Sequence, residues 1–379
     1  MTPVKIIFSI LVGIAVIAGA YFILTKENQP SSNSPIRIGY VGPLTGDGAV
    51  WGIVEKNAIE LGMKEINTAG GINGRPLALI SEDGKCEGAA GVAAFQKLIS
   101  VDEIKIIFVS CSQEIIPIAP IAQEKKVIAW TSYASASSIS DLGEYVFRNS
   151  YSNTQMASAM ARVTALKGKR AAILSEVSAF ASDLRDIFIN DFTINGGTIT
   201  ANENFQQGVK DFRAQIAKII STQPEVVVIN PTSPATGIAA LQQLRELGFK
   251  GQVIGNFFGG SKSVQVMPEA QGMIYVSDPV FAESPAKKHA FEAYAEEYGS
   301  TPDLEWPLGA RYDAIYILRD ALAAVGDDPV KVKDYLHNMP SDFKGVLGSY
   351  RFKKDSGDIT NIQPSILQIQ GNKSEAYNG

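Results

Sequence analysis

The sequence of 379 residues has little of the residue types on which most enzyme and metal sites depend. It contains two Cys and two His, and neither His289 nor His337 lies in a recognised catalytic sequence. No HExxH, paired Cys/His spacing or G-x-S-x-G elbow is present. We therefore predict a protein that is not an enzyme and that uses neither a metal nor a cofactor.

The sequence also lacks any concentration of positive charge. The net charge is −5, the isoelectric point is about 5.3, and Lys and Arg do not cluster. Proteins bind nucleic acids through a basic face that contacts phosphates, so a nucleic-acid partner is not expected.

The first 35 residues differ from the rest of the chain. Residues 6–24 form an uncharged apolar run about as long as a bilayer-spanning helix, and Lys5 precedes it. Residues 18–20 resemble a signal-peptidase site, so both a cleaved signal and a retained anchor stay open. We favour the anchor, because cleavage would leave the apolar residues 21–24 at the mature end. Polar residues 25–35 then predict a tether, and the remaining chain is expected outside the cytoplasm.

Cys86 and Cys111 are the two cysteines of the chain. In an exported protein such a pair more often forms a disulfide than two free thiols. We therefore predict a bond between them. Two buried reduced thiols would require a cytoplasmic location.

From residue 36, short apolar runs alternate with amphipathic stretches. Strands are predicted at 36–41, 77–80, 104–109 and 127–130, with helices at 54–68, 89–98 and 117–124. The rhythm restarts with helices at 156–166, 184–195, 211–221 and 238–247 and strands at 171–174, 226–229 and 253–254. Helices at 309–324 and 330–336 and strands at 348–352 and 365–370 follow. This alternation predicts two doubly wound α/β units with mostly parallel sheets.

Gly46, Gly48 and Gly52 follow the first predicted strand, where a dinucleotide-binding loop would lie. The spacing is one residue too long, and Glu82 lies farther on than the usual ribose-binding acid. A nucleotide-dependent enzyme is therefore a remote alternative. The simpler interpretation is a loop whose backbone closely approaches a ligand.

Several short sequences occur in a characteristic order along the chain. They are IGYVGPLTG at 38–46, GGING at 70–74, the acids at 82–83, DF at 211–212 and YDA at 312–314. In this order they resemble the periplasmic leucine/isoleucine/valine-binding proteins, a branch of the type I periplasmic binding proteins, over residues 36–371. The resemblance implies a two-lobed clamshell that binds its ligand at the carboxyl ends of the strands and closes by a hinge motion.

The resemblance also implies a division of the chain. Residues 36–151 and 282–340 would form lobe one, and residues 152–281 and 341–371 would form lobe two. Residues 1–24 would be the signal or anchor helix, 25–35 the tether, and 372–379 a C-terminal tail. The chain is expected to cross between the lobes near Ser152, Phe281 and Pro340.

Residues of lobe one are implied as ligand contacts by the same resemblance. Ser112 follows the second cysteine and Ser135 follows the next strand, and both would bind a carboxylate together with the backbone of Tyr133. Ser112 is also expected at a helix N-terminus, whose N–H groups favour an anion, and a plain N-cap role is the alternative. Trp51 matches the aromatic residue that covers the side-chain pocket in leucine-binding members.

Lobe two departs from the family pattern. Phe180 stands where the family has a Tyr, and Phe257 stands where it has the Glu that pairs with the ligand's ammonium group. A buried ammonium without a counter-charge would cost several kcal/mol. Either the ligand has no ammonium group or another acid replaces that Glu. The candidate acids are Glu176, Asp183 and Asp278.

Taken together, these features predict an extracytoplasmic substrate-binding protein of an ABC importer. Its ligand would be a small carboxylate, either a branched-chain or other amino acid or an apolar or aromatic acid. Its partner would be a permease in the membrane, and the protein itself is expected to be a monomer. The alternative is a clamshell of the same kind that senses a ligand for a receptor or signalling partner.

Overall fold

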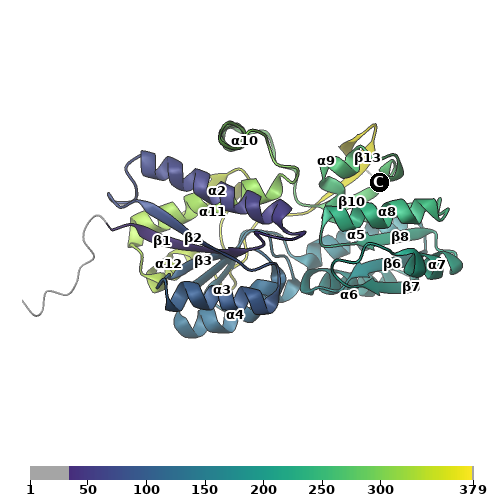
Figure 1. Ribbon diagram of the computed structural model, residues 1–379, viewed down its shortest axis with the longest axis horizontal. Helices are drawn as coiled ribbons and strands as arrows, with labels where there is room; N and C mark the ends of the chain where they lie inside the picture. Colours follow the sequence, from purple (N-terminus) through teal and green to yellow (C-terminus); the bar gives the residue numbers. More distant parts are fainter. Residues whose placement is uncertain (1–33, 378–379) are drawn as a thin grey trace, which may run out of the picture.

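The computed structural model describes residues 34–377, which form two α/β lobes side by side along the long axis (Figure 1). The predicted apolar helix at 6–24 and most of the tether lie outside the described residues. Within residues 34–377, no helix is long and apolar enough to span a bilayer.

Lobe one is built on five parallel strands in the order β2-β1-β3-β4-β5. They are β1 (Ile36–Gly42), β2 (Leu77–Asp83), β3 (Ile106–Val109), β4 (Ile128–Thr131) and β5 (Val146–Arg148). Because side chains alternate across a strand, Phe108 packs on one face of the sheet and Ile107 on the other.

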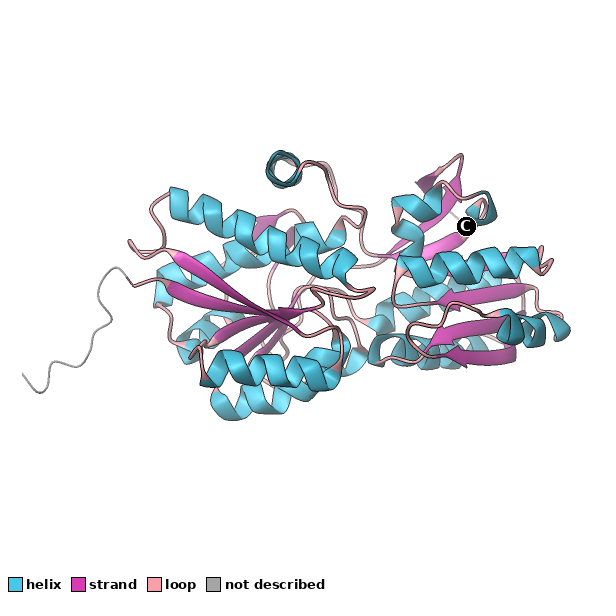
Figure 2. Ribbon diagram, viewed as in Figure 1, coloured by secondary structure: helices cyan, strands magenta, loops and turns pink. Residues whose placement is uncertain are grey.

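Helices cover both faces of this sheet (Figure 2). One face carries α2 (Ala49–Thr68) and α11 (Trp306–Val325), with α10 (Pro285–Tyr298) and α12 (Pro329–His337) beside them. The other face carries α3 (Gly88–Ser100) and α4 (Ser112–Lys125). The long helix α11 therefore returns to lobe one after the chain has built most of lobe two.

Lobe two contains a seven-stranded sheet in the order β14-β13-β10-β9-β8-β6-β7. The strands are β6 (Arg170–Glu176), β7 (Thr198–Phe205), β8 (Val226–Asn230), β9 (Gln252–Gly255), β10 (Ile274–Ser277), β13 (Ser365–Gln370) and β14 (Lys373–Ala376). One face packs on α5 (Asn153–Lys167) and α6 (Ala179–Ile194), and the other on α7 (Arg213–Ser221) and α8 (Pro234–Glu246). β13 and β14 run antiparallel to their neighbours, whereas the other five strands of this sheet are parallel. The predicted α/β class with mostly parallel sheets is therefore confirmed.

The third crossing between the lobes lies later than the predicted Pro340. After α12 comes a hairpin of β11 (Phe343–Gly345) and β12 (Gly348–Tyr350), and the segment that follows packs on lobe one. The Phe352 ring lies 5.2 Å from that of Trp130, and Asp358 forms an ion pair with Arg148 at 2.6 Å. The chain therefore reaches lobe two shortly before Ser365.

Residues 373–376 form the edge strand β14 instead of the predicted tail. Gly371 and Asn372 have φ angles of 57° and 65°. Two successive residues with positive φ make the turn that joins a tight hairpin, so the chain folds back from β13 and pairs with it.

Candidate functional site

The carboxyl ends of the strands in both lobes face one cavity between the lobes. From lobe one, the segments that follow the five strands contribute Trp51, Cys86, Cys111, Ser112, Gln113, Tyr133, Ala134, Ser135 and Tyr151. From lobe two, the segments that follow β6, β8, β9 and β10 contribute Phe180, Thr232, Phe257 and Asp278. Open α/β sheets bind ligands at these strand ends, so this cavity is the candidate site.

All six residues that the sequence predicts as ligand contacts line this cavity: Trp51, Ser112, Tyr133, Ser135, Phe180 and Phe257. The structure brings them together from five separate segments, each of which follows a different strand. Their contact with a ligand remains a prediction.

Ser112 and Ser135 are both buried, but their hydroxyl groups are used differently. The Oγ atom of Ser112 accepts a hydrogen bond from the backbone N–H of Ala136 at 3.2 Å. The hydroxyl of Ser135 donates to Oδ1 of Asn153 at 2.8 Å. A hydroxyl has one hydrogen to donate, so Ser135 has already used its own, whereas Ser112 donates to no acceptor among the described residues.

Ser112 is not the N-cap of α4, which corrects the alternative considered for it. The N-cap is Cys111, and Ser112 is the first residue of the helix. The first N–H groups of a helix have no partner within it and favour a negative charge. The hydroxyl of Ser112 therefore lies at a helix end that is suited to an anion.

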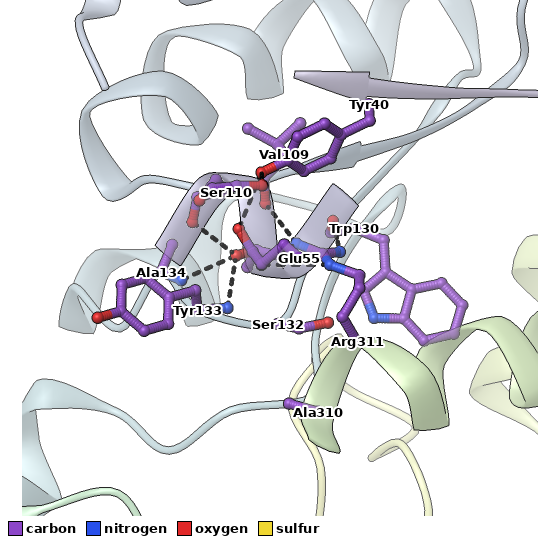
Figure 3. A network of polar contacts seen from close by, with 12 residues as sticks. Tyr40, Glu55, Val109, Ser110, Trp130, Ser132, Tyr133, Ala134, Ala310 and Arg311 are labelled. Atoms are coloured by element: carbon purple, nitrogen blue, oxygen red, sulfur yellow. Dashed lines mark hydrogen bonds and ion pairs between the residues drawn. The ribbon is translucent and has the colours of Figure 1, made fainter. Parts of the chain in front are cut away.

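A buried ion pair supports the loops that carry these serines (Figure 3). Glu55 and Arg311 are fully buried, and Nη2 of Arg311 lies 2.5 Å from Oε1 of Glu55. Arg311 also donates to the carbonyl oxygens of Val109 at 3.4 Å and Trp130 at 3.3 Å. Since those residues belong to β3 and β4, the pair ties together the strands that precede Ser112 and Ser135.

The loop after β4 is held further by its own hydrogen bonds. The Oγ1 atom of Thr131 accepts from the N–H groups of Tyr133 at 3.3 Å and Ala134 at 2.9 Å. Nε1 of Trp306 donates to the carbonyl of Ser132 at 2.9 Å. These contacts fix the loop before any ligand arrives, which lowers the ordering cost of binding.

The predicted disulfide between Cys86 and Cys111 is confirmed, with Cα atoms 5.4 Å apart. Behind it, the carboxyl group of Glu114 accepts from the N–H groups of Cys86 at 3.0 Å and Cys111 at 2.9 Å. Burial raises the pKa of Glu114 to about 8, although the two hydrogen bonds oppose this shift. The disulfide and Glu114 together join the loop after β2 to the start of α4.

Aromatic rings form a wall that is continuous between the lobes. Trp51 and Tyr133 stack with centroids 5.5 Å apart, and Phe257 meets Tyr133 edge-on at 6.0 Å. Phe180 meets Phe257 at 5.7 Å. Among the described residues, Nε1 of Trp51 and the hydroxyl of Tyr133 are buried without a hydrogen-bond partner. The aromatic wall is therefore apolar apart from these two polar atoms, which have no partner among the described residues.

The three candidate acids have different surroundings. Glu176 accepts from the N–H of Thr232 at 2.9 Å and from its hydroxyl at 2.5 Å. Asp183 accepts from the N–H of Ser137 at 2.8 Å and from Nδ2 of Asn153 at 2.9 Å. Neither of these two lines the cavity, whereas Asp278 does.

Tyr151 and Thr232 line the cavity but were not predicted. Thr232 follows β8, a strand that the sequence indicates, so the rule that ligands bind at strand ends could have found it. Tyr151 follows β5, which has three residues and was not predicted, so no sequence signal pointed to it.

The glycines after β1 do not line the cavity, which corrects their predicted approach to a ligand. A Cβ atom on Gly52 would lie 2.0 Å from the carbonyl oxygen of Pro43, and one on Gly48 would lie 2.7 Å from the Pro43 ring. Gly46 has φ of +74°. Gly48 and Gly52 therefore let the start of α2 pack on the preceding loop, whereas Gly46 supplies a left-handed backbone conformation.

The sequence and the fold of this chain are similar to those of known periplasmic binding proteins. A family model for periplasmic binding proteins matches residues 35–371. A Leu/Ile/Val-binding protein of Rhizobium johnstonii is 28% identical over 356 residues, which cover 91% of this chain and 94% of the relative.

Solved structures share the fold. A leucine-binding protein of Thermotoga maritima has a TM-score of 0.81 at 23% identity, covering 90% of this chain and 97% of that one. A solute-binding protein of an ABC transporter from R. palustris, solved with benzoate, has a TM-score of 0.79 at 20% identity, covering 90% and 95%.

Proposed function

This chain belongs to the periplasmic binding protein family, in the type I branch that includes the leucine/isoleucine/valine-binding proteins, and from this we propose that it is the substrate-binding protein of an ABC importer. Members of the family carry ligands and are not enzymes. The protein would act outside the cytoplasm, take up a small carboxylate between its lobes and present the closed form to a permease.

The observation that carries this proposal is the pairing of an anion site with an apolar wall in one interlobe cavity. The start of α4 and the free hydroxyl hydrogen of Ser112 suit a carboxylate. The rings of Trp51, Tyr133, Phe180 and Phe257 suit an apolar or aromatic group. Relatives named for leucine, isoleucine and valine and a neighbour solved with benzoate support the same ligand class.

Substitution of the serines tests the site. Ser112→Ala should weaken binding by about 1–3 kcal/mol, the usual value for a hydrogen bond to a charged group. Ser135→Ala should cost less, because the hydrogen of Ser135 is already donated to Asn153. Titration calorimetry against branched-chain amino acids and aromatic carboxylates, on protein freed of co-purified ligand, measures both.

Ser284→Ala is the matched control, because Ser284 caps α10 away from the cavity. It should reduce stability and leave affinity unchanged. Wild-type affinity in the Ser112→Ala/Ser135→Ala double variant would contradict the assignment.

Uptake separates the importer from a sensor. Cells that lack this protein should lose high-affinity uptake of whichever ligand binds the purified protein. If uptake persists and a transcriptional or behavioural response to that ligand is lost instead, the protein is a sensor.

A further inference from the structure

Four polar side chains from three helices of lobe one meet at a point outside the interlobe cavity. Glu65 lies near the end of α2, His289 lies in α10, and Tyr312 and Tyr316 lie on α11. Residues four apart share one face of a helix, so both tyrosines point the same way. None of the four residues lines the cavity.

The polar atoms of this cluster lie at the spacing of ligands around one metal ion. Oε2 of Glu65 accepts a hydrogen bond from the hydroxyl of Tyr312 at 2.5 Å and another from that of Tyr316. The two hydroxyl oxygens lie 3.3 Å apart, and Nε2 of His289 lies 3.1 Å from Oε1 of Glu65. Metal–ligand bonds of about 2.0–2.1 Å at right angles put neighbouring ligand atoms about 3 Å apart.

Packing between the helices holds these four side chains in place. The hydroxyl of Tyr298 in α10 donates to the carbonyl of Asn57 in α2 at 3.1 Å, and so fixes the two helices relative to each other. Tyr312 is buried and Glu65 is half-buried, whereas the side chain of His289 is 63% exposed. The cluster is therefore preformed on rigid elements and open to solvent on the His289 side.

The charges of the cluster favour a cation. Within residues 34–377, Glu65 pairs with no Lys or Arg, and His289 is its one partner that can carry a positive charge. Burial raises the pKa of both tyrosines, to about 12 for Tyr316, and Glu65 adds to the shift, which Arg319 opposes at Tyr316. A bound metal ion reverses such shifts, because it stabilises the ionised form of each ligand.

We propose that Glu65, His289, Tyr312 and Tyr316 bind a ferric ion on the helical face of lobe one. Two phenolates and one carboxylate carry three negative charges, which match a trivalent cation, and oxygen ligands suit a hard ion. Tyrosine and histidine both serve as iron ligands in proteins. Each tyrosine exchanges its hydroxyl proton for a bond to the metal, so binding releases two protons. Water or a small anion would fill the remaining positions on the exposed side.

The chain has no local sequence signal for this site, because Glu65 and His289 are 224 positions apart. Within the part of the chain that the structure describes, no three residues drawn from His, Cys, Asp and Glu alone come together as metal ligands. The two tyrosines complete the set. The expectation from the sequence that no metal is used is therefore revised by this proposal.

Titration of the purified protein with ferric citrate tests the site. A phenolate bound to ferric iron absorbs visible light by charge transfer, so a visible band should grow and saturate at one ion per chain. Calorimetry in two buffers of different ionisation enthalpy should show the release of two protons per ion. Zinc sulfate should bind at least about tenfold more weakly, because a divalent ion leaves one ligand charge uncompensated.

Tyr312→Phe and Tyr316→Phe keep the ring and remove one ligand each. Each variant should weaken ferric binding by about tenfold or more, since loss of an outer-shell partner alone costs that much, and the double variant should lose the band. Tyr298→Phe is the matched control, because it removes a tyrosine hydroxyl that joins α10 to α2 outside the cluster. It should bind the ion as the wild type does.

The outcomes are decisive and independent of the proposed function. A wild-type protein that gains no visible band overturns the inference, and so does a band that persists in the double variant. Zinc that binds as tightly as ferric ion overturns the assignment to a trivalent cation. The double variant should keep the wild-type affinity for the ligand of the cavity, which also shows that it is folded.

Discussion

Glu55 and Arg311 show how a single buried residue supports the candidate site. Glu55→Gln would leave the guanidinium of Arg311 buried without its counter-charge, which costs about 3–5 kcal/mol of unfolding free energy. Urea denaturation measures this. Lys56→Gln is the matched control, because the neighbouring pair with Glu60 is partly exposed to solvent and should contribute less than about 1 kcal/mol. Equal losses in the two variants would contradict the supporting role.

Glu114 should make stability depend on pH. Its pKa in the folded protein is raised to about 8, so the folded state keeps a proton that the unfolded chain has lost. The free energy of unfolding should therefore fall as the pH rises from about 5 to 8, by on the order of a few kcal/mol. Asp278 and Asp313, each with a pKa of about 7, act in the same direction.

Glu114→Gln should flatten the part of this dependence that extends above pH 7, as urea denaturation at pH 5, 7 and 9 would show. Glu124→Gln, on the exposed side of the same helix, should leave the slope unchanged. A wild-type slope in Glu114→Gln would mean that the two backbone hydrogen bonds keep this carboxyl ionised.

The sequence predicted which residues line the cavity better than it predicted their roles. Ser112 and Trp51 could be placed because short motifs precede them. The choice among Glu176, Asp183 and Asp278 could not be made, because partners far along the chain decide it. For example, the hydroxyl of Thr232, which lies 56 residues along the chain, donates a hydrogen bond to the carboxylate of Glu176. Such pairings are set by tertiary structure and leave no local pattern.

At the scale of elements, the disulfide connects the loop after β2 to α4. Replacing both cysteines by Ala should lower the unfolding free energy by about 3 kcal/mol on the chain-entropy estimate for a loop of this length. Ligand affinity should fall as well, because Ser112 directly follows Cys111. Thermal unfolding and calorimetry test the two effects. A fall in stability with unchanged affinity would mean that Glu114 alone positions α4.

Buried apolar runs predicted the central strands, but edges and helix ends were harder to predict. β7 lies at the sheet edge, where all but one of its residues are half-buried or exposed, and it has no apolar run to reveal it. The predicted start of α4 at residue 117 was wrong, since the helix begins at Ser112. Proline normally marks a helix start, but Pro117 and Pro120 lie inside this helix. These differences matter, since the true start of α4 is at the cavity.

For the whole molecule, the alternation of strands and helices predicted two parallel-sheet lobes, and the structure has them. The late crossing near residue 360 was not predictable, because the segment around Phe352 packs on lobe one through aromatic contacts with distant residues. The position of this crossing matters for closure, since it is one of the segments about which the lobes would move.

Two carboxylates join the lobes in the same manner. Asp183 of α6 accepts from the N–H of Ser137 at 2.8 Å and from its hydroxyl at 2.5 Å. Asp303, in the lobe-one loop between α10 and α11, accepts from the N–H of Lys262 at 2.8 Å and from the hydroxyl of Ser261 at 2.5 Å. Neither carboxylate lines the cavity, so both can affect binding without touching the ligand.

Removing either carboxylate should therefore weaken binding by favouring the open form. The apparent Kd rises in inverse proportion to the fraction of molecules in the closed form, and we expect a rise of about tenfold for Asp183→Ala and for Asp303→Ala. Small-angle scattering should show a larger radius of gyration without ligand and the wild-type value at saturation. Asp186→Ala is the control, because Asp186 lies on the same helix α6 and pairs within lobe two with Arg185. Loss of affinity in Asp183→Ala alone would instead point to Asn153, which bonds both Asp183 and Ser135, as the route of the effect.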